Sequence, residues 1–363
     1  MLPLVFDNFF FFIPFFWLSF LFWSFFFFFN TSNVRVKQSL SKDKFMLTDL
    51  SFKNTFNFVF FDLVIINFLF LFLFFFSFRG WSCSFFFNTF GLNNTVVYIL
   101  FIYLLFVCFL FLLLRLLDKF SLNYEFDFFF SIFNFFLVSN FFFLAKSFVS
   151  FFFLIEILSC FVFYQFITST VFYKKVKEST TSSINNFHSK QLLSVLFFQY
   201  WASFFSSVIF VYIFSLLIFL FGTTDWFVLN FLFGFSFFDF SNTNTYLFLF
   251  LFLLFTFSFF IKLGLSPVQL FKIEIYKGLP FLSIFFYTVF YFFIFFLFFF
   301  YLVIAYFTNI WLLIWYVTFF FLVIGGIYAL NLMFDTKFVK AFFAYSTVIN
   351  TLGFLSLFVV ILS

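Results

Sequence analysis

Long apolar runs separated by short polar connectors dominate the chain. These runs have no polar face and no period-two alternation, so the pattern predicts membrane-spanning helices and not a β-barrel. Each approaches or exceeds the roughly 20 residues that cross a bilayer as a helix. The ten predicted spans lie near residues 3–29, 58–78, 96–117, 127–145, 148–169, 192–221, 246–265 with a broken continuation to 279, 281–307, 310–329 and 343–362.

Composition supports the same fold class. Hydrophobic residues make up 66% of the 363 positions and charged residues only 9%, whereas a soluble domain carries about 25% charged residues. A chain of this composition cannot cover itself with polar surface in water, which excludes a soluble globular protein. We therefore predict an all-α polytopic membrane protein, with residues 1–363 forming a single transmembrane bundle.

Phenylalanine alone accounts for 99 positions. Leu, Ile, Val and Phe all suit a lipid environment, so we interpret the excess as codon drift in a very AT-rich genome, which is common in organelles. The N-terminal sequence MLPLVFDNFFFFIPFFWLSF has no basic n-region, no cleavage site and no Arg/Ser-rich amphipathic start. Either the first span stays in the protein or no import signal is needed.

Basic residues alternate between successive connectors, which predicts the orientation of the chain. With the connectors numbered one to nine, the even ones carry only Arg79 and Lys146. Loops rich in Lys and Arg stay on the side where the chain is made. In a mitochondrion the odd loops would therefore face the matrix, and both termini the intermembrane space. The odd connectors carry Arg35, Lys37, Lys42, Lys44, Lys53, Arg115, Lys119, Lys174, Lys175, Lys177, Lys190, Lys272, Lys277, Lys337 and Lys340.

The sequence offers few residues for metal or nucleotide chemistry. Its cysteines, Cys83, Cys108 and Cys160, are scattered without a C-x-x-C pair, and the single histidine, His188, has no neighbouring ligands, so we predict no metal site. No glycine-rich phosphate loop is present. The formal charge of +5 is not clustered as a nucleic-acid-binding face requires. We expect no cofactor in this chain and no nucleic-acid partner.

The ionisable residues at membrane depth in the predicted spans are Asp7, Asp62, Glu156 and Lys262. A charge at the bilayer centre costs at least about 2.5–3.5 kcal/mol. Asp7 and Asp62 lie near span ends, where a side chain reaches the interface. Glu156 lies one third to one half of the way into its span, and Lys262 lies about 24 Å along a helix that begins near Tyr246. These two residues are therefore the candidates for a function inside the membrane.

A helix break follows Lys262 in the stretch IKLGLSPVQLFKIEIYKGLP, residues 261–280. One straight helix over 246–279 would be about 50 Å long, too long for a single crossing. Gly264 and Pro267 allow a bend or a split, since proline lacks the N–H group and its ring clashes with the preceding turn. Broken helices at membrane depth line wet or protein-packed cavities.

A buried acid, a buried base and a broken helix together favour an ion or proton path. A desolvated lysine gives up its proton readily, and a nearby glutamate opposes that loss. Moving the glutamate would thus switch Lys262 between its two protonation states. The alternative from the residues alone is a structural ion pair between Glu156 and Lys262 that fixes the helix register.

The same stretch resembles the family of NADH dehydrogenase subunit 2, the antiporter-like membrane-arm subunits of mitochondrial respiratory complex I. The family pattern is approximately K-[LM]-x-x-x-P-F-H-x-W-x-P-[DE]-V-Y-x-G-x-P. Three other stretches resemble further helices of the family in the same order, across residues 148–355: IEILS, SKQLLSVLFFQYWASFFSSVIFVYIFSLLIFLFG and FVKAFFAYSTVINTLGF. The residues in register with the pattern are Lys262, Pro267, Glu274, Tyr276, Gly278 and Pro280.

The resemblance implies a fourteen-helix antiporter-like fold with two inverted five-helix repeats, each containing a broken helix. Residues 1–125 would form the first three helices, 126–307 the first repeat and 308–363 the start of the second. Helices eleven to fourteen would be missing, so either a separate chain supplies them or the gene has shrunk. Other complex I membrane-arm subunits and lipids would be the partners.

The implied activity is that of a subunit of the proton-translocating NADH:ubiquinone reductase of the mitochondrial inner membrane. The chain would hold no redox centre or cofactor of its own. Quinone reduction elsewhere in the complex would drive protons through a relay in which Lys262 carries the proton and Glu156 controls it. The two alternatives are a structural membrane-arm subunit that has lost pumping and a free-standing cation/proton antiporter.

The chain departs from the family at several positions. Val268, Gln269 and Phe271 replace the family's Phe, His and Trp, and Asn350 replaces a histidine. The family places a second lysine in helix eight, but residues 281–336 contain no Lys or His. Other polar residues of this region are then the candidates for the path: Ser283, Tyr287, Thr288 and Tyr291.

Overall fold

The computed structural model is almost entirely helical in the part of the chain that it describes. The chain divides into two units, Met1–Tyr124 and Glu125–Ser363, each described by itself. The predicted spans 3–29 and 58–78, with Asp7 and Asp62, lie wholly or mostly outside the described residues. These described residues are 65, 68, 69, 71, 83–85, 89–116, 126–177, 182–238, 243–265, 268–306 and 308–362.

The first unit contains the helix α3 (Asn94–Leu116) and a short antiparallel ribbon. The strands β1 (Cys83–Phe85) and β2 (Phe90–Leu92) pair Cys83 with Leu92. One face of α3 is buried, and its Phe111 ring stacks on Phe68 with centroids 5.9 Å apart. The ribbon lies in the connector between the predicted spans 58–78 and 96–117, where the sequence predicts no helix.

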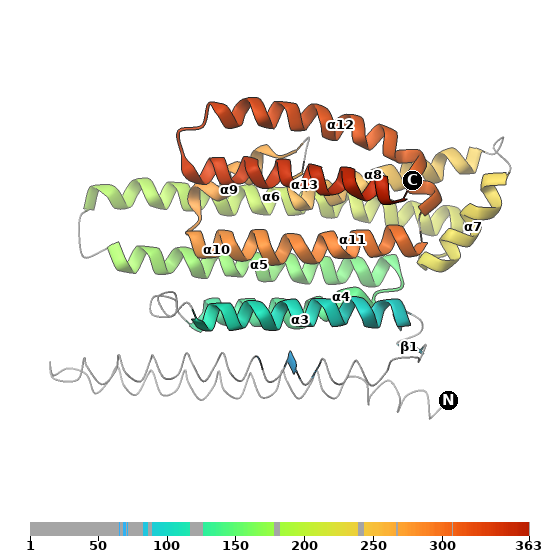
Figure 1. Ribbon diagram of the computed structural model, residues 1–363, viewed down its shortest axis with the longest axis horizontal. Helices are drawn as coiled ribbons and strands as arrows, with labels where there is room; N and C mark the ends of the chain where they lie inside the picture. Colours follow the sequence, from blue (N-terminus) through green and yellow to red (C-terminus); the bar gives the residue numbers. More distant parts are fainter. Residues whose placement is uncertain are drawn as a thin grey trace. The chain divides into compact units, whose positions relative to one another are not determined.

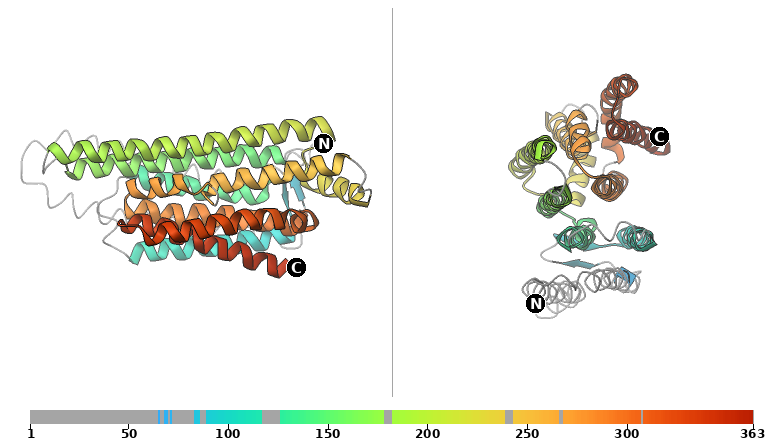
Figure 2. Two further views of the ribbon diagram at one scale, coloured as in Figure 1. Left: turned by 90° about the horizontal axis from the view of Figure 1, so that it is seen from above. Right: turned by 90° about the vertical axis from the view of Figure 1, so that its left-hand side faces the viewer.

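The second unit is a bundle whose long helices lie side by side (Figures 1 and 2). The helix α5 packs between α4 and α6, α6 packs on α8 and α9, and α12 pairs with α13, which also contacts α9. Its elements are α4 (Phe126–Leu144), α5 (Phe148–Lys177), α6 (Ser182–Phe221), α7 (Trp226–Phe238), α8 (Thr243–Leu263), α9 (Leu270–Gly278), α10 (Phe281–Phe286), the π-helix η2 (Tyr287–Tyr291), α11 (Phe292–Tyr306), α12 (Thr308–Phe334) and α13 (Val339–Leu362).

Five helices among the described residues are long and apolar enough to cross a membrane. These helices make the chain an all-α membrane protein, as predicted; the antiporter-like fold, the count of ten spans and the division into repeats stay predictions. The qualifying segments are Asn94–Leu113, Phe148–Ser169, Leu193–Phe221, Tyr246–Leu263 and Ser283–Tyr306.

The helix α7 is absent from the predicted spans, because its 13 residues are too few to cross a bilayer. It lies obliquely at one end of the bundle (Figure 1). Two backbone hydrogen bonds fix its start to the turn before α5: Trp226 N–H donates to the Lys146 carbonyl at 3.1 Å, and Phe148 N–H donates to the Thr224 carbonyl at 2.8 Å.

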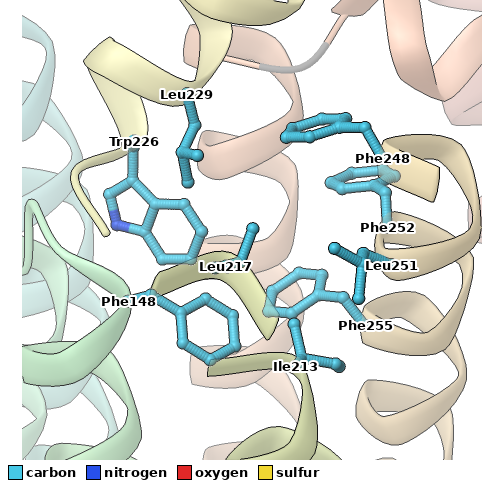
Figure 3. Close-up of a pocket in the computed structure, with 9 residues that line it drawn as sticks. All are labelled: Phe148, Ile213, Leu217, Trp226, Leu229, Phe248, Leu251, Phe252 and Phe255. Atoms are coloured by element: carbon cyan, nitrogen blue, oxygen red, sulfur yellow. The ribbon is translucent and has the colours of Figure 1, made fainter. Parts of the chain in front are cut away.

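An apolar pocket lies where α7 meets α5, α6 and α8 (Figure 3). The residues that line it include no ionisable side chain, so the pocket supplies packing and no acid–base chemistry. They are Phe148, Ile213, Leu217, Trp226, Leu229, Phe248, Leu251, Phe252 and Phe255.

Aromatic rings form the core between α4, α5, α8 and α11. The Phe298 ring lies 4.2 Å from Phe142 and 4.9 Å from Phe151, measured between centroids. Phe295 contacts Phe142 at 5.3 Å and Phe259 at 5.8 Å. Aromatic pairs at these separations add about 0.5–1.5 kcal/mol each beyond the burial of their area. This core lies one helical turn before the end of α8 and holds that end in place.

Candidate functional site

Gly264 ends α8 with a Schellman motif. Its N–H donates to the Ile261 carbonyl at 3.1 Å, and the Leu265 N–H donates to the Phe260 carbonyl at 2.9 Å. Gly264 has φ +63°, and a Cβ added there would lie 3.0 Å from the Lys272 Cβ. Glycine is thus required both by the backbone conformation and by the close approach of α9. The predicted contribution of Pro267 lies outside the described residues.

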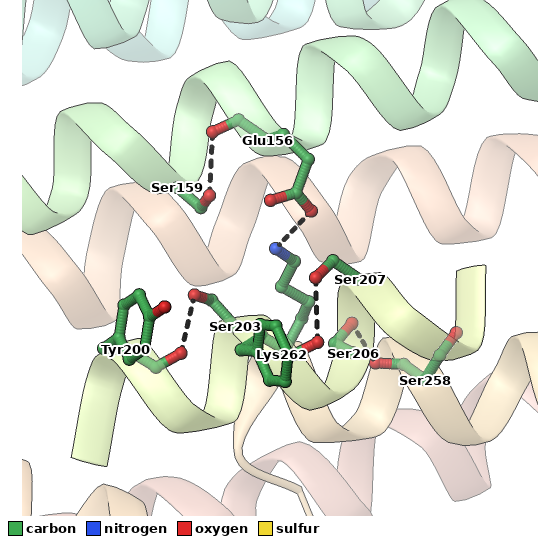
Figure 4. Close-up of polar contacts among 9 residues, drawn as sticks. Glu156, Ser159, Tyr200, Ser203, Ser206, Ser207, Ser258 and Lys262 are labelled. Carbon is green, nitrogen blue, oxygen red and sulfur yellow. Dashed lines mark hydrogen bonds and ion pairs between the residues drawn. The ribbon is translucent and has the colours of Figure 1, made fainter. Parts of the chain in front are cut away.

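The structure brings Lys262 and Glu156 together. The Lys262 Nζ, in the last turn of α8, donates to Oε1 of Glu156 on α5 at 3.0 Å (Figure 4). The Lys262 side chain is 1% exposed and that of Glu156 is 32% exposed. The ammonium group is therefore enclosed, while the carboxylate keeps one open side. Two charges that would each be costly alone at membrane depth compensate one another.

The serine hydroxyls near this pair donate to backbone carbonyls and not to the charged groups. Ser206 Oγ on α6 donates to the Ser258 carbonyl on α8 at 3.0 Å, one turn before Lys262. Ser159 Oγ donates to the Glu156 backbone carbonyl at 2.7 Å. Figure 4 shows these serines beside the ion pair. The first hydrogen bond joins α6 to α8 one turn before Lys262, and the second stays within α5.

Contacts to α12 and α13 position α9 beyond the break. Gln269 Nε2 donates to the Gly325 carbonyl on α12 at 3.3 Å, and Lys340 Nζ on α13 donates to the Leu279 carbonyl at 2.6 Å. The Gln269 Oε1 atom is buried without a hydrogen-bond partner among the described residues. The break therefore lies between segments held by different helices, and it contains polar atoms with unused hydrogen-bonding capacity.

The four predicted path residues fall into two groups. Ser283 Oγ donates to the Pro280 carbonyl at 2.8 Å and Thr288 Oγ1 to the Ile284 carbonyl at 2.9 Å, so both serve their own helix. Tyr287 and Tyr291 begin and end the π-helix η2, and their rings stack 5.2 Å apart. Both hydroxyls are buried without a hydrogen-bond partner among the described residues. π-Helical turns occur frequently at functional sites.

A small cavity connects Tyr291 with Gln165, a residue of α5 that the sequence analysis did not single out. Both side chains line the cavity, and the Gln165 Nε2 atom is buried without a hydrogen-bond partner in the described part of the chain. Tyr291 also lies within electrostatic range of Glu156. The sequence could have indicated Gln165, because it is the lone amide side chain in the apolar span that follows Glu156.

The structure places Lys272 elsewhere than the sequence analysis did. The sequence analysis counted Lys272 among the basic residues of an odd-numbered connector, but the residue lies on α9 and is 1% exposed. The helix resumes immediately after the break, so the segment folds back into the bundle before it reaches a connector.

Within the described residues, no group of three or more His, Cys, Asp and Glu side chains is placed to hold a metal ion.

The fold and site together define a helical membrane protein with a buried lysine–glutamate pair at a broken helix. No protein-family model matches the chain. It is 40% identical over 67 residues to the uncharacterized mitochondrial protein ORF4 of Paramecium tetraurelia. That similarity covers 18% of this chain and 43% of the relative, so the chain matches less than half of the relative's length.

Proposed function

We propose that this chain is a membrane-arm subunit of a proton-pumping NADH:ubiquinone oxidoreductase of the mitochondrial inner membrane. The observation that carries the proposal is the ion pair of Lys262 and Glu156 at the end of a broken helix. The ordered set of motifs that resembles the NADH dehydrogenase subunit 2 family supports it. The relative from Paramecium, which is described as mitochondrial, supports the location.

The ion pair supplies the chemistry of a controlled proton carrier. While Glu156 stays ionised beside Lys262, it stabilises the ammonium form of the lysine. If Glu156 moves away or takes up a proton, the enclosed ammonium loses its compensating charge and releases its proton to the next acceptor. The open side of Glu156 allows its protonation, and the Gly264 break separates α8 from α9.

Buried polar groups beside the pair support a route for the released proton. Tyr291 lies within electrostatic range of Glu156, Tyr287 stacks on Tyr291, and Gln165 lines the same cavity as Tyr291. Each has a polar atom whose hydrogen-bonding capacity no described residue uses. The two tyrosine hydroxyls can each donate and accept a hydrogen bond, as a proton relay requires, whereas the Gln165 Nε2 group can only donate one. The route would run from α5 toward η2, with no further lysine on η2 or α11.

The close enclosure of Lys262 favours a second candidate function, that of a structural membrane-arm subunit. Its side chain is 1% exposed, and the neighbouring Phe259 and Phe260 rings pack on Phe299. In that case the ion pair would only fix the register of α5 and α8. The two functions differ in what happens when the charges are removed and the complex still assembles.

Lys262→Met and Glu156→Gln test the proposed function. Both substitutions keep side-chain size, so we expect the complex to assemble and oxidise NADH, with fewer protons moved per NADH because the carrier or its control is lost. The measurement is NADH-driven proton uptake by vesicles containing complex purified through a tag on this chain. Ser203→Ala, whose hydroxyl bonds only to its own helix among the described residues, is the control.

Two results would contradict the proposal. If the tagged chain copurifies without NADH:quinone reductase activity, it is not a subunit of that enzyme. If both assembled variants pump like the parent complex, the chain has the structural function instead.

A further inference from the structure

Lys272 is a buried cation without an ion-pair partner among the described residues. Lys262 is paired with Glu156 and Lys277 with Glu274, while Lys340 donates a hydrogen bond to the Leu279 carbonyl. Lys272 is 1% exposed, and its Nζ lies 4.8 Å from the centroid of the Phe292 ring. The face of a ring attracts a cation but compensates less of its charge than a carboxylate does.

The position of Lys272 links the helix break to the π-helix. Its aliphatic stem lies against Gly264, which follows Lys262 by two residues. Its nitrogen lies over Phe292, the residue directly after Tyr291 at the end of η2. The lysine thus reaches from the end of α8 to the segment that carries the two unpartnered tyrosine hydroxyls.

The surroundings favour exchange between the two protonation states of Lys272. The apolar environment favours the neutral amine, whereas the Phe292 ring favours the ammonium ion. A lysine that only filled space would need none of these features, because a methionine would pack equally well beside Gly264.

We propose that Lys272 is a second proton-carrying residue of the same pathway, placed after Lys262 and before the tyrosines of η2. This inference rests on the proposed function of the chain. The neutral Lys272 amine accepts one proton released by Lys262 and becomes an ammonium ion. It returns to the amine when it passes that proton to the next hydrogen-bonding group, and no other bond forms or breaks.

Three substitutions separate proton exchange from charge and from packing. Lys272→Met keeps the length and removes the charge, Lys272→Gln adds a polar group that does not titrate, and Lys272→Arg keeps a charge that is not released. The proton uptake that depends on Lys262 is the difference between the parent complex and Lys262→Met. We expect this uptake to fall at least about tenfold in all three Lys272 variants. NADH oxidation and the assembled amount should stay near those of the parent. Lys277→Met, at the half-buried lysine of α9 that pairs with Glu274, should pump normally.

Each alternative result has a defined meaning. Normal proton uptake with Lys272→Met or Lys272→Gln shows a packing residue, and normal uptake with Lys272→Arg shows a fixed charge; either overturns the proposal. Failure of all three variants to assemble assigns Lys272 to folding and also overturns it. If Lys262→Met itself pumps normally, the proposed function fails; if only the Lys272 variants pump normally, this inference fails alone.

Discussion

Gly264→Ala is expected to destabilise the second unit by about 2–5 kcal/mol. The positive φ of +63° costs an alanine about 1–2 kcal/mol. The new Cβ would also lie 3.0 Å from the Lys272 Cβ and 3.1 Å from the Phe271 ring, and such overpacking costs about 1–3 kcal/mol. Because both neighbours belong to α9, the clash would push that helix away from the end of α8.

Two other glycines separate these contributions. Gly222 has φ +67° with nothing within 4 Å of an added Cβ, so Gly222→Ala should show the conformational cost alone. Gly353 lies in α13 with the same open space and no positive φ, so Gly353→Ala should be neutral or stabilising. The measurement is the midpoint of thermal unfolding of the purified full-length chain in detergent. Equal losses for Gly264→Ala and Gly222→Ala would show that α9 yields to the contact at no cost.

The buried ion pair could be predicted from the sequence because of its energetic cost. Glu156 and Lys262 are flanked by apolar residues, and an isolated charge at membrane depth costs at least about 2.5–3.5 kcal/mol. Each therefore needs a partner, and the chain offers few others. The helix break was predictable for a similar reason, since the segment 246–279 is too long for one crossing.

Other features depend on packing that the sequence does not record. Ser283 and Tyr287 look equally suitable for a polar path, but only the fold shows that one hydroxyl bonds its own helix while the other does not. The burial of Lys272 depends on where α9 begins after the break. The Phe-rich composition removes the periodicity that would otherwise show which face of each helix is buried. The short helix α7 was missed because a length criterion recognises only segments that span a bilayer.

The ion pair affects the stability of the chain and, in the proposed function, also carries protons. Variants that remove one charge or both can separate these two effects. A buried pair contributes little net stability compared with apolar residues of similar volume, but removing one partner leaves an uncompensated charge. Stability should therefore depend on the balance of charge at the site, whereas proton transfer should depend on the presence of both groups.

Glu156→Leu is expected to destabilise the chain by about 3–5 kcal/mol, because it leaves the enclosed Lys262 ammonium without its carboxylate. The double variant Glu156→Leu/Lys262→Met should recover most of this loss, since it replaces both charges with apolar groups. Thermal unfolding of the tagged chain in detergent gives the three stabilities. Ser203→Ala, on the neighbouring α6, serves again as the control.

Proton uptake by the double variant then distinguishes the two functions of the pair. In the proposed pump, the double variant assembles stably yet moves fewer protons per NADH, because neither the carrier nor its control is present. In a purely structural subunit, restored stability would restore normal proton uptake. If the single and double variants are equally unstable, the 3.0 Å contact between Lys262 Nζ and Glu156 Oε1 does not compensate these charges, and the interpretation of the site as an ion pair is wrong.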